Sequence, residues 1–226
     1  MSLRDALSSD LLLPMSLKIE LYADQLERWP RNGRHILAQF DEESVVVYQA
    51  YSHSIGTFAA SHGYFGGDFK FTRMSWIKPN FLWMMYRSGW GTKPGQEVTL
   101  AIRMQRDGFD NILAQAVHST FVPEVYSSHE AWKERLALSP IRLQWDPDHD
   151  PHGTKQDRRA IQLGLSGEVL KKYAREWVVD IEDISDFVTL QREHALTGNT
   201  ELVTPQEEIY PVRDEAVFRS LQLSEA

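Results

Sequence analysis

Cysteine does not occur in this chain of 226 residues. The absence of thiols excludes disulfide bonds, thiolate nucleophiles and zinc sites built on cysteine. A chain without disulfides suits a reducing compartment, so we expect an intracellular, cytoplasmic protein.

Long apolar runs are also missing from the start of the chain. Residues 1–14 contain one short apolar triplet, Leu11-Leu-Leu13, which is far shorter than a signal-peptide core or a membrane span. We therefore expect a soluble protein with no membrane partner.

Positive charge is scarce, because 24 lysines and arginines face 32 aspartates and glutamates, giving a formal net charge of -8. Such an acidic chain is not expected to coat nucleic acid or an anionic membrane, and any anion-binding site must be local. Nothing in the sequence indicates the oligomeric state.

Acidic residues are absent between Asp68 and Glu97, although they are common elsewhere. We call this segment the acid-free segment, and its cations are Lys70, Arg73, Lys78, Arg87 and Lys93. They are interleaved with Trp76, Phe81, Trp83, Tyr86 and Trp90. Guanidinium groups pair with phosphates and aromatic rings stack on bases, so the segment predicts a site for a nucleotide-like ligand. The alternative is that the rings form core and the cations are merely solvated.

The length and a hydrophobic fraction of 42% fit one sizeable domain. Apolar β-branched runs predict strands over residues 36–40, 44–51, 98–104, 141–145, 160–165 and 209–212. Caps and helical spacing predict helices over residues 54–62, 80–87, 109–117, 128–136, 166–177 and, as the last one, 185–196. Residues 197–208 are expected to form a loop.

This irregular alternation predicts an α+β fold with a central, largely antiparallel or split β-sheet flanked by helices. We assign residues 31–226 to that single domain. Residues 1–30 are treated as an N-terminal extension, because the opening Met-Ser-Leu recurs at residues 15–17.

Aspartates alternate at Asp146, Asp148 and Asp150, as oxygen ligands do in the first half of a calcium loop. Pro151 stands where that loop needs glycine for its sharp turn, which excludes a calcium hand. A looser divalent site, with hydrolysis at the metal, and a plain structured turn remain as alternatives. The histidines show no zinc-ligand spacing, so we expect no metal cofactor.

An acidic pair, Glu207 and Glu208, precedes the last predicted strand. A carboxylate there can act as a general base or stabilise developing positive charge on a sugar. The alternative is a solvated acidic face.

Five strings of the sequence form a recognisable set: Val47-Tyr-Gln-Ala-Tyr51, Arg73-Met-Ser-Trp-Ile-Lys-Pro79, Phe81-Leu-Trp-Met-Met-Tyr-Arg-Ser88, Gln144-Trp-Asp-Pro-Asp-His-Asp150 and Arg159-Ala-Ile-Gln-Leu-Gly164. Through them residues 34–212 resemble the domain-of-unknown-function family 4291 of bacterial and fungal proteins. This resemblance implies no activity.

The order of strand 45–51, helix 54–62 and Gly63 also resembles the opening of ADP-ribosyltransferase-type folds. In those folds the first strand holds NAD, and here Tyr48-Gln-Ala-Tyr51 would occupy its place, with Gln49 replacing the usual histidine. The resemblance implies that Ser75 lies near the nicotinamide and that Glu207 or Glu208 is the catalytic glutamate.

The same scheme implies roles for the remaining side chains. Arg73, Lys78 and Arg87 would hold the pyrophosphate, because cations stabilise it. Trp76, Tyr48 or Tyr86 would stack on nicotinamide or adenine, and Gln49 would hydrogen-bond a ribose hydroxyl or the carboxamide with either end of its amide.

The sequence therefore leads us to expect a transferase that uses NAD as substrate and moves ADP-ribose to nucleic acid or protein. The alternative is a non-enzymatic module that binds a nucleotide or single-stranded nucleic acid by stacking and backbone charge.

Overall fold

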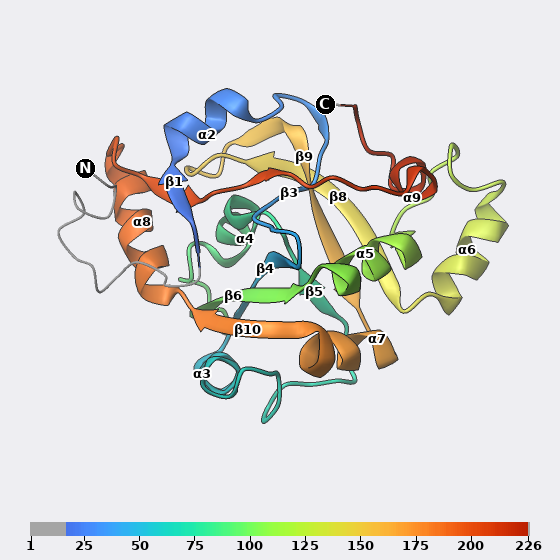
Figure 1. The fold of residues 1–226 in the computed structure, drawn as a ribbon, viewed down its shortest axis with the longest axis horizontal. Coiled ribbons are helices and arrows are strands. Elements are labelled where there is room, and N and C mark those ends of the chain that lie inside the picture. The colour runs from blue at the N-terminus through green and yellow to red at the C-terminus, as the bar shows by residue number, and fades with distance from the viewer. Residues whose placement is uncertain (1–16, 226) are drawn as a thin grey trace.

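Two β-sheets lie at the centre of the fold, which a computed structural model describes for residues 17–225 (Figure 1). The first is antiparallel, with the order β10 (Val178–Asp183), β6 (Val98–Gln105), β4 (Ser44–Tyr51). The second is mixed, with the order β2 (Gly33–Arg34), β9 (Lys155–Leu165), β8 (Ile141–His149), β7 (Val117–His118). The expected α+β fold with a split sheet is confirmed.

A short strand, β5 (Ser75–Ile77), connects the two sheets. It pairs antiparallel with β9, and the next residue, Lys78, forms a β-bridge with Tyr48 of β4. The acid-free segment is therefore held between both sheets, which decides where its side chains lie.

Strand β4 separates two hydrophobic clusters, because successive side chains of a strand point to opposite faces. Val45 and Val47 pack with the larger cluster, whereas Val46 and Tyr48 pack with the cluster that contains Phe81. Val45, Val46 and Val47 are all buried, which is why this strand is apolar on both faces.

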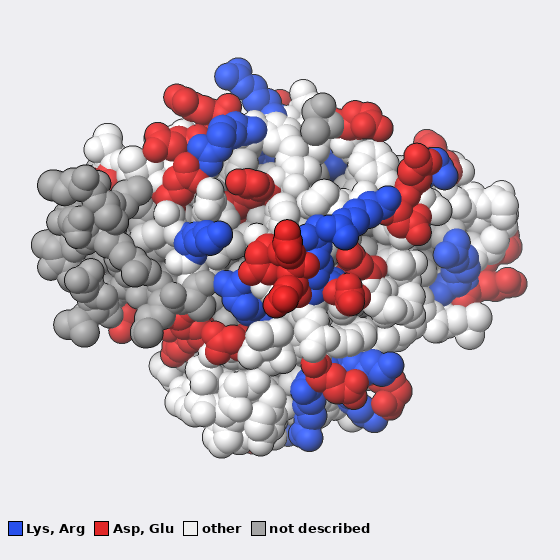
Figure 2. Space-filling view, viewed as in Figure 1, with Lys and Arg blue, Asp and Glu red and all other residues white. Residues whose placement is uncertain are grey.

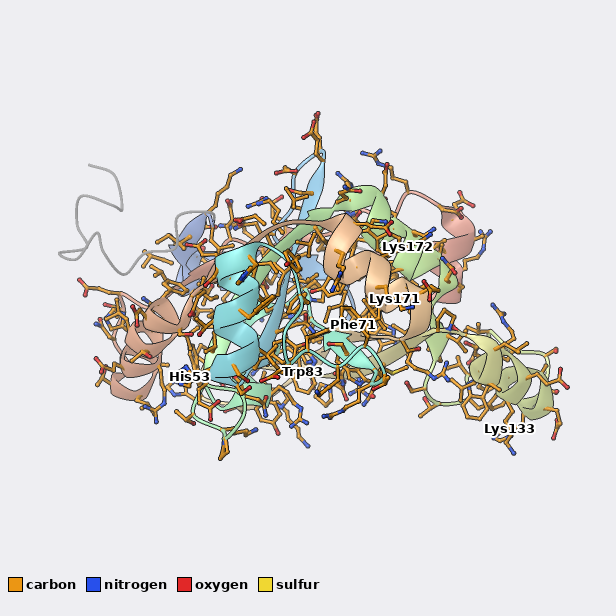
Figure 3. All side chains as sticks on the ribbon, turned by 90° about the horizontal axis from the view of Figure 1, so that it is seen from below. His53, Phe71, Trp83, Lys133, Lys171 and Lys172 are labelled. Carbon is orange, nitrogen blue, oxygen red and sulfur yellow. The ribbon has the colours of Figure 1, made fainter. Side chains whose placement is uncertain are left out.

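Helices surround the sheets (Figure 1). In chain order they are α2 (Tyr22–Arg28), α3 (His53–His62), α4 (Phe81–Ser88), α5 (Arg106–Gln115), α6 (His129–Leu138), α7 (Gly167–Lys172), which continues as a π-helical turn over Tyr173–Trp177, α8 (Ser185–Thr197) and α9 (Glu215–Ser220). Helix α6 buries none of its residues and stands at the edge of the molecule in both ribbon views (Figures 1 and 3).

Helix α4 lies within one residue of the predicted helix over residues 80–87 at both ends. Asn80 is its N-cap, with the side-chain oxygen accepting from Trp83 N at 2.7 Å, and Gly89 ends it in the left-handed conformation that glycine favours. The N-cap of helix α3 is Ser52, two residues before the expected Ser54.

Several elements depart from the sequence prediction. Strand β10 was not predicted, and α9 follows the helix expected to be the last. The expected loop 197–208 contains β11 (Val203–Pro205), which pairs with β1 (Ile19–Leu21), and the expected last strand is the short β12 (Glu208–Ile209), which pairs with β3 (Leu37–Ala38). These pairings join residues far apart in sequence, and a local pattern does not report them.

Residues 19–28, which we treated as part of an N-terminal extension, form β1 and α2. Gln25 of α2 donates from Nε2 to Thr204 Oγ1 at 2.8 Å, so this segment is bonded to the rest of the fold. Residues 1–14, the subject of the leader and membrane expectation, lie outside the described part of the chain. None of the helices in residues 17–225 combines the length and apolar character needed to cross a membrane.

Candidate functional site

A cavity of about 480 Å³ lies where β4, β5, α4 and the hairpin of β8 and β9 meet. We call it the main cavity. Its charged and polar lining comes from Arg73, Lys78 and Arg87, and from Gln49, Tyr51, Ser75, Gln96, Gln144 and Gln162. The apolar part of the wall is Ala50, Met74, Trp76 and Met84. Residues from both ends of the acid-free segment therefore share one hollow.

Three cations line this cavity without a carboxylate opposite them. Among the described residues no aspartate or glutamate belongs to the lining, and Arg73, Lys78 and Arg87 form no ion pair with any described residue. The outer face in Figure 2 is different, because lysine and arginine alternate there with aspartate and glutamate. An uncompensated group of cations in a concave site attracts an anion, and phosphate is the anion that guanidinium matches best.

Lys78 is the most buried of the three cations, with 4% of its surface exposed. Its backbone is fixed by two hydrogen bonds to Tyr48, of 2.7 Å and 3.3 Å. Burial, and secondly the charge of Arg87, lower the pKa of Lys78 to about 8, whereas Asp146 acts in the opposite direction. A substantial fraction of this amine is therefore uncharged just above neutral pH.

A hydrogen-bond network underlies one wall of the cavity. Gln49 Nε2 lies 2.8 Å from both Tyr51 Oη and Ser75 Oγ and 3.1 Å from Trp76 O, so its two protons are shared among three acceptors. Gln49 Oε1 accepts from Tyr173 Oη at 2.8 Å. Both ends of the Gln49 amide therefore have partners within the protein, and Gln49 positions the two hydroxyls. Gln49 also lines the cavity, and its contact with a ligand stays a prediction.

Those two hydroxyls, Tyr51 Oη and Ser75 Oγ, lie 2.6 Å apart. Each lies 2.8 Å from Gln49 Nε2, and one of the two hydroxyls donates to the other. Since each hydroxyl carries one proton, the remaining proton is available to an acceptor in the cavity.

Two glutamines stand opposite each other on the hairpin, at Gln144 of β8 and Gln162 of β9. Their Nε2 groups donate to the two carboxylate oxygens of Asp146, at 2.9 Å and 2.7 Å. Asp146 thereby orients both amides, and within the described residues their carbonyl oxygens accept no hydrogen bond. These oxygens are acceptors that a hydroxyl or amino group of a ligand can use.

Trp76 packs against the backbone of Gly164 on β9. A Cβ added at Gly164 would lie 2.6 Å from Met74 Sδ and 3.0 Å from two atoms of the Trp76 indole. Glycine is therefore required if the indole is to lie this close to the strand, where its ring forms part of the cavity wall.

A second cavity of about 290 Å³ adjoins the main cavity and shares Tyr51, Arg73, Met74 and Ser75 with it. Its further lining includes Lys70, another cation of the acid-free segment. Arg73 thus lines both cavities.

Tyr48 and Tyr86 do not line either cavity. Tyr48 is fully buried on the other face of β4, with its ring edge-on to Phe81. Tyr86 stacks on His149 with the ring centres 3.5 Å apart. Strand alternation and this stack place both rings away from the site, which does not fit the ligand-stacking role expected for them.

Glu207 and Glu208 also lie outside the main cavity. Glu207 is buried beneath the start of α4, where its carboxylate accepts from Phe81 N at 2.6 Å and from Asn80 Nδ2 at 2.9 Å. Burial raises the pKa of Glu207. Glu208 is exposed on β12. The structure therefore gives Glu207 a helix-capping position, and neither carboxylate faces the cations.

The three alternating aspartates have separate partners. Asp146 holds the two glutamines, Asp148 forms a buried ion pair with Arg158 at 2.6 Å, and Asp150 accepts from the backbone of the following turn. Within residues 17–225 no group of three histidine, aspartate or glutamate side chains is arranged to hold a metal ion. Asp146 and Asp148 lie within β8 and Asp150 opens the turn after it, so the geometry favours a strand that ends in a structured turn.

Sequence reasoning did not select Gln96, Gln144 or Gln162, which complete the lining. The sequence does mark Gln144 and Gln162, because each is a polar residue between apolar neighbours on strand β8 or β9. Gln96 lies in a loop, and the sequence does not mark it.

Comparison with known proteins bears on the chain as a whole. A search of proteins with curated descriptions gives no match. Comparison with protein families matches residues 35–210 to the family described as "Domain of unknown function (DUF4291)". That match covers most of the chain and includes the whole main cavity. On this basis the protein belongs to the DUF4291 family.

Proposed function

We propose that this protein binds a nucleotide in the main cavity. Arg73, Lys78 and Arg87 would hold its phosphates, and the indole of Trp76 offers a flat surface for its base. The unpaired amide oxygens of Gln144 and Gln162 would accept from ribose hydroxyls or from an amino group of the base.

One observation carries this proposal: three cations from different elements line one hollow and have no carboxylate partner within the described chain. Burying Lys78 near the exposed Arg87 costs free energy, as the lowered pKa of Lys78 illustrates. A bound polyphosphate offsets that cost, because its negative charge pairs with all three groups.

NAD is one nucleotide that fits this description, and the adjoining second cavity would take the other half of a dinucleotide. Transfer of ADP-ribose from NAD stays a prediction. It needs a carboxylate beside the ribose to stabilise positive charge in the transition state, and Glu207 and Glu208 do not supply one in the main cavity.

Thermal unfolding with ligands tests the proposal. A ligand that binds only the folded state stabilises it by about 2.7 kcal/mol at a hundredfold excess over Kd, so ATP or NAD at millimolar concentration should raise Tm. Arg73→Ala and Arg87→Ala should each abolish most of that rise. Lys133→Ala, which removes a cation from the outlying helix α6, is the matched control and should leave it unchanged (Figure 3).

An oligonucleotide provides the contrasting result. Single-stranded nucleic acid binds with strong salt dependence because counterions are released from its backbone. A salt-sensitive rise in Tm with a short oligonucleotide, together with no rise from ATP or NAD, would replace the nucleotide proposal with the nucleic-acid module.

A further inference from the structure

We propose that Lys78 is a nucleophile that takes up a nucleoside 5′-phosphate covalently from a nucleotide containing a phosphoanhydride bond, such as ATP or NAD. This inference rests on the proposed function, since it needs the nucleotide to lie in the main cavity. It adds a reaction and a reacting atom to that site.

The position of Lys78 supports a chemical role. The side chain is nearly inaccessible from outside, yet it lines the cavity, and its ammonium group has no hydrogen bond or ion pair within the described residues. A lysine that serves only structure is normally paired when buried, because an unpaired buried charge is costly. Lys78 instead lines the main cavity together with Arg73 and Arg87, on a backbone that is bonded to β4.

The surroundings also favour the reactive form of the amine. A lysine becomes nucleophilic at neutral pH when it is desolvated and lies near another cation, and burial together with Arg87 has that effect on the pKa of Lys78. Arg73 and Arg87 line the same cavity, so their guanidinium groups are available to bind phosphate while Lys78 reacts.

The proposed step balances as follows. The lone pair of neutral Lys78 Nζ attacks the α-phosphorus, and an N–P bond forms. The bond between that phosphorus and the bridging oxygen breaks, and its electron pair leaves with pyrophosphate when the donor is ATP, or with nicotinamide mononucleotide when the donor is NAD. One proton passes from Nζ to water, leaving a phosphoramidate on the lysine. Arg73 and Arg87 would stabilise the charge that develops on the phosphate oxygens.

The experiment incubates the full chain with ATP labelled at the α-phosphate, or with NAD labelled at the adenylyl phosphate. Mg²⁺ is included because polyphosphates bind it. We expect label that survives denaturation and alkali but is released by acid, as a phosphoramidate should be, and peptide mapping should place it on Lys78. The leaving group identifies the donor: pyrophosphate from ATP, or nicotinamide mononucleotide from NAD.

Lys78→Arg is the decisive variant, because it keeps a cation in the cavity but offers no nucleophile near neutral pH. It should lose the label, and the rise in Tm with ATP or NAD, measured on the same variant, separates loss of the reaction from loss of binding. Lys172→Arg, on the exposed surface of α7, is the matched control and should keep the label (Figure 3). If Lys78→Arg fails to fold, the peptide map of the natural chain still identifies the labelled residue.

The outcomes separate this inference from the proposed function. A rise in Tm with ATP or NAD but no acid-labile label would leave nucleotide binding in place and refute the covalent step. Label on a residue other than Lys78 would refute it as well. Release of free nicotinamide from NAD without label would favour ADP-ribose transfer, and the absence of any nucleotide effect would overturn both proposals.

Discussion

Tyr48 and Lys78 are paired by two backbone hydrogen bonds, yet their side chains lie in different parts of the molecule. The Tyr48 ring is in the core with Phe81, and the Lys78 side chain lines the main cavity. The site is thus attached directly to the central sheet, and its most buried cation does not depend on a loop for its position.

Tyr48→Phe should stabilise the protein. The Tyr48 hydroxyl is buried without a hydrogen-bond partner in the described chain, and removing an unsatisfied polar group of this kind gains about 1 kcal/mol. Chemical denaturation measures the change, and nucleotide binding should not be affected. Tyr173→Phe is the matched contrast: it removes the bond to Gln49 Oε1 and should destabilise by about 1 kcal/mol. Equal effects from the two variants would contradict this account.

Replacing Glu207 should change stability and spare ligand binding. Its carboxylate accepts two buried hydrogen bonds at the start of α4, so Glu207→Ala should cost about 2–4 kcal/mol. Glu207→Gln should cost less, because an amide oxygen can still accept from Phe81 N. Denaturant unfolding gives both values. A loss of nucleotide-induced stabilisation in a folded Glu207→Gln protein would instead return this residue to the site.

Breaking the ion pair between Asp148 and Arg158 should be strongly destabilising. The pair is buried, with 2% and 5% of the side chains exposed, and Arg158 also donates to Pro30 O at 2.6 Å. Removing one partner leaves a buried charge uncompensated, so Arg158→Met should cost about 3–5 kcal/mol. Arg219→Ala breaks an exposed ion pair on α9 and should cost less than about 0.5 kcal/mol. Similar midpoints for the two variants would refute this difference.

Stability should fall as pH drops from about 6.5 toward 4. Burial lowers the pKa of His118 to about 4, from a usual value near 6.5, and its Nδ1 lies 3.1 Å from Tyr126 Oη. Between those pH values the unfolded chain binds a proton that the folded chain does not, so folding is penalised as pH falls. Allowing for solvent screening, the loss is about 1–2 kcal/mol. His118→Asn keeps a nearby acceptor and removes the titration, and denaturant titrations at pH 7 and 4.5 should show a smaller drop for it.

Gly164→Ala should weaken ligand binding with only a modest loss of stability. The added methyl would displace Met74 and Trp76, and the indole is the proposed base platform. Losing a stacked ring costs about 1–3 kcal/mol, which is roughly tenfold or more in Kd for ATP. Calorimetric titration measures this affinity. Adding Met74→Ala to Gly164→Ala makes room for the methyl and should recover part of it, and no recovery would show that the contact is not responsible.

Local sequence signals sufficed for α4 and for β4. Asn80 and Gly89 mark the two ends of α4, because a cap forms its hydrogen bonds within one turn of the helix. The apolar run of β4 reflects burial on both faces of the strand. The same signals missed β10, and they missed the pairing of β1 with β11, since those depend on partners far along the chain.

For the candidate site, the sequence by itself determined the charge: a stretch free of acids supplies Arg73, Lys78 and Arg87, and no fold can add a carboxylate to that stretch. Only the tertiary structure decided that these cations meet in one hollow, that Gln144 and Gln162 join them, and that Glu207 caps a helix instead. The reason is physical. Composition is a property of the chain alone, whereas a shared cavity depends on which strands pair, and β5 forms this one by pairing with β9 and continuing into the bridge to β4.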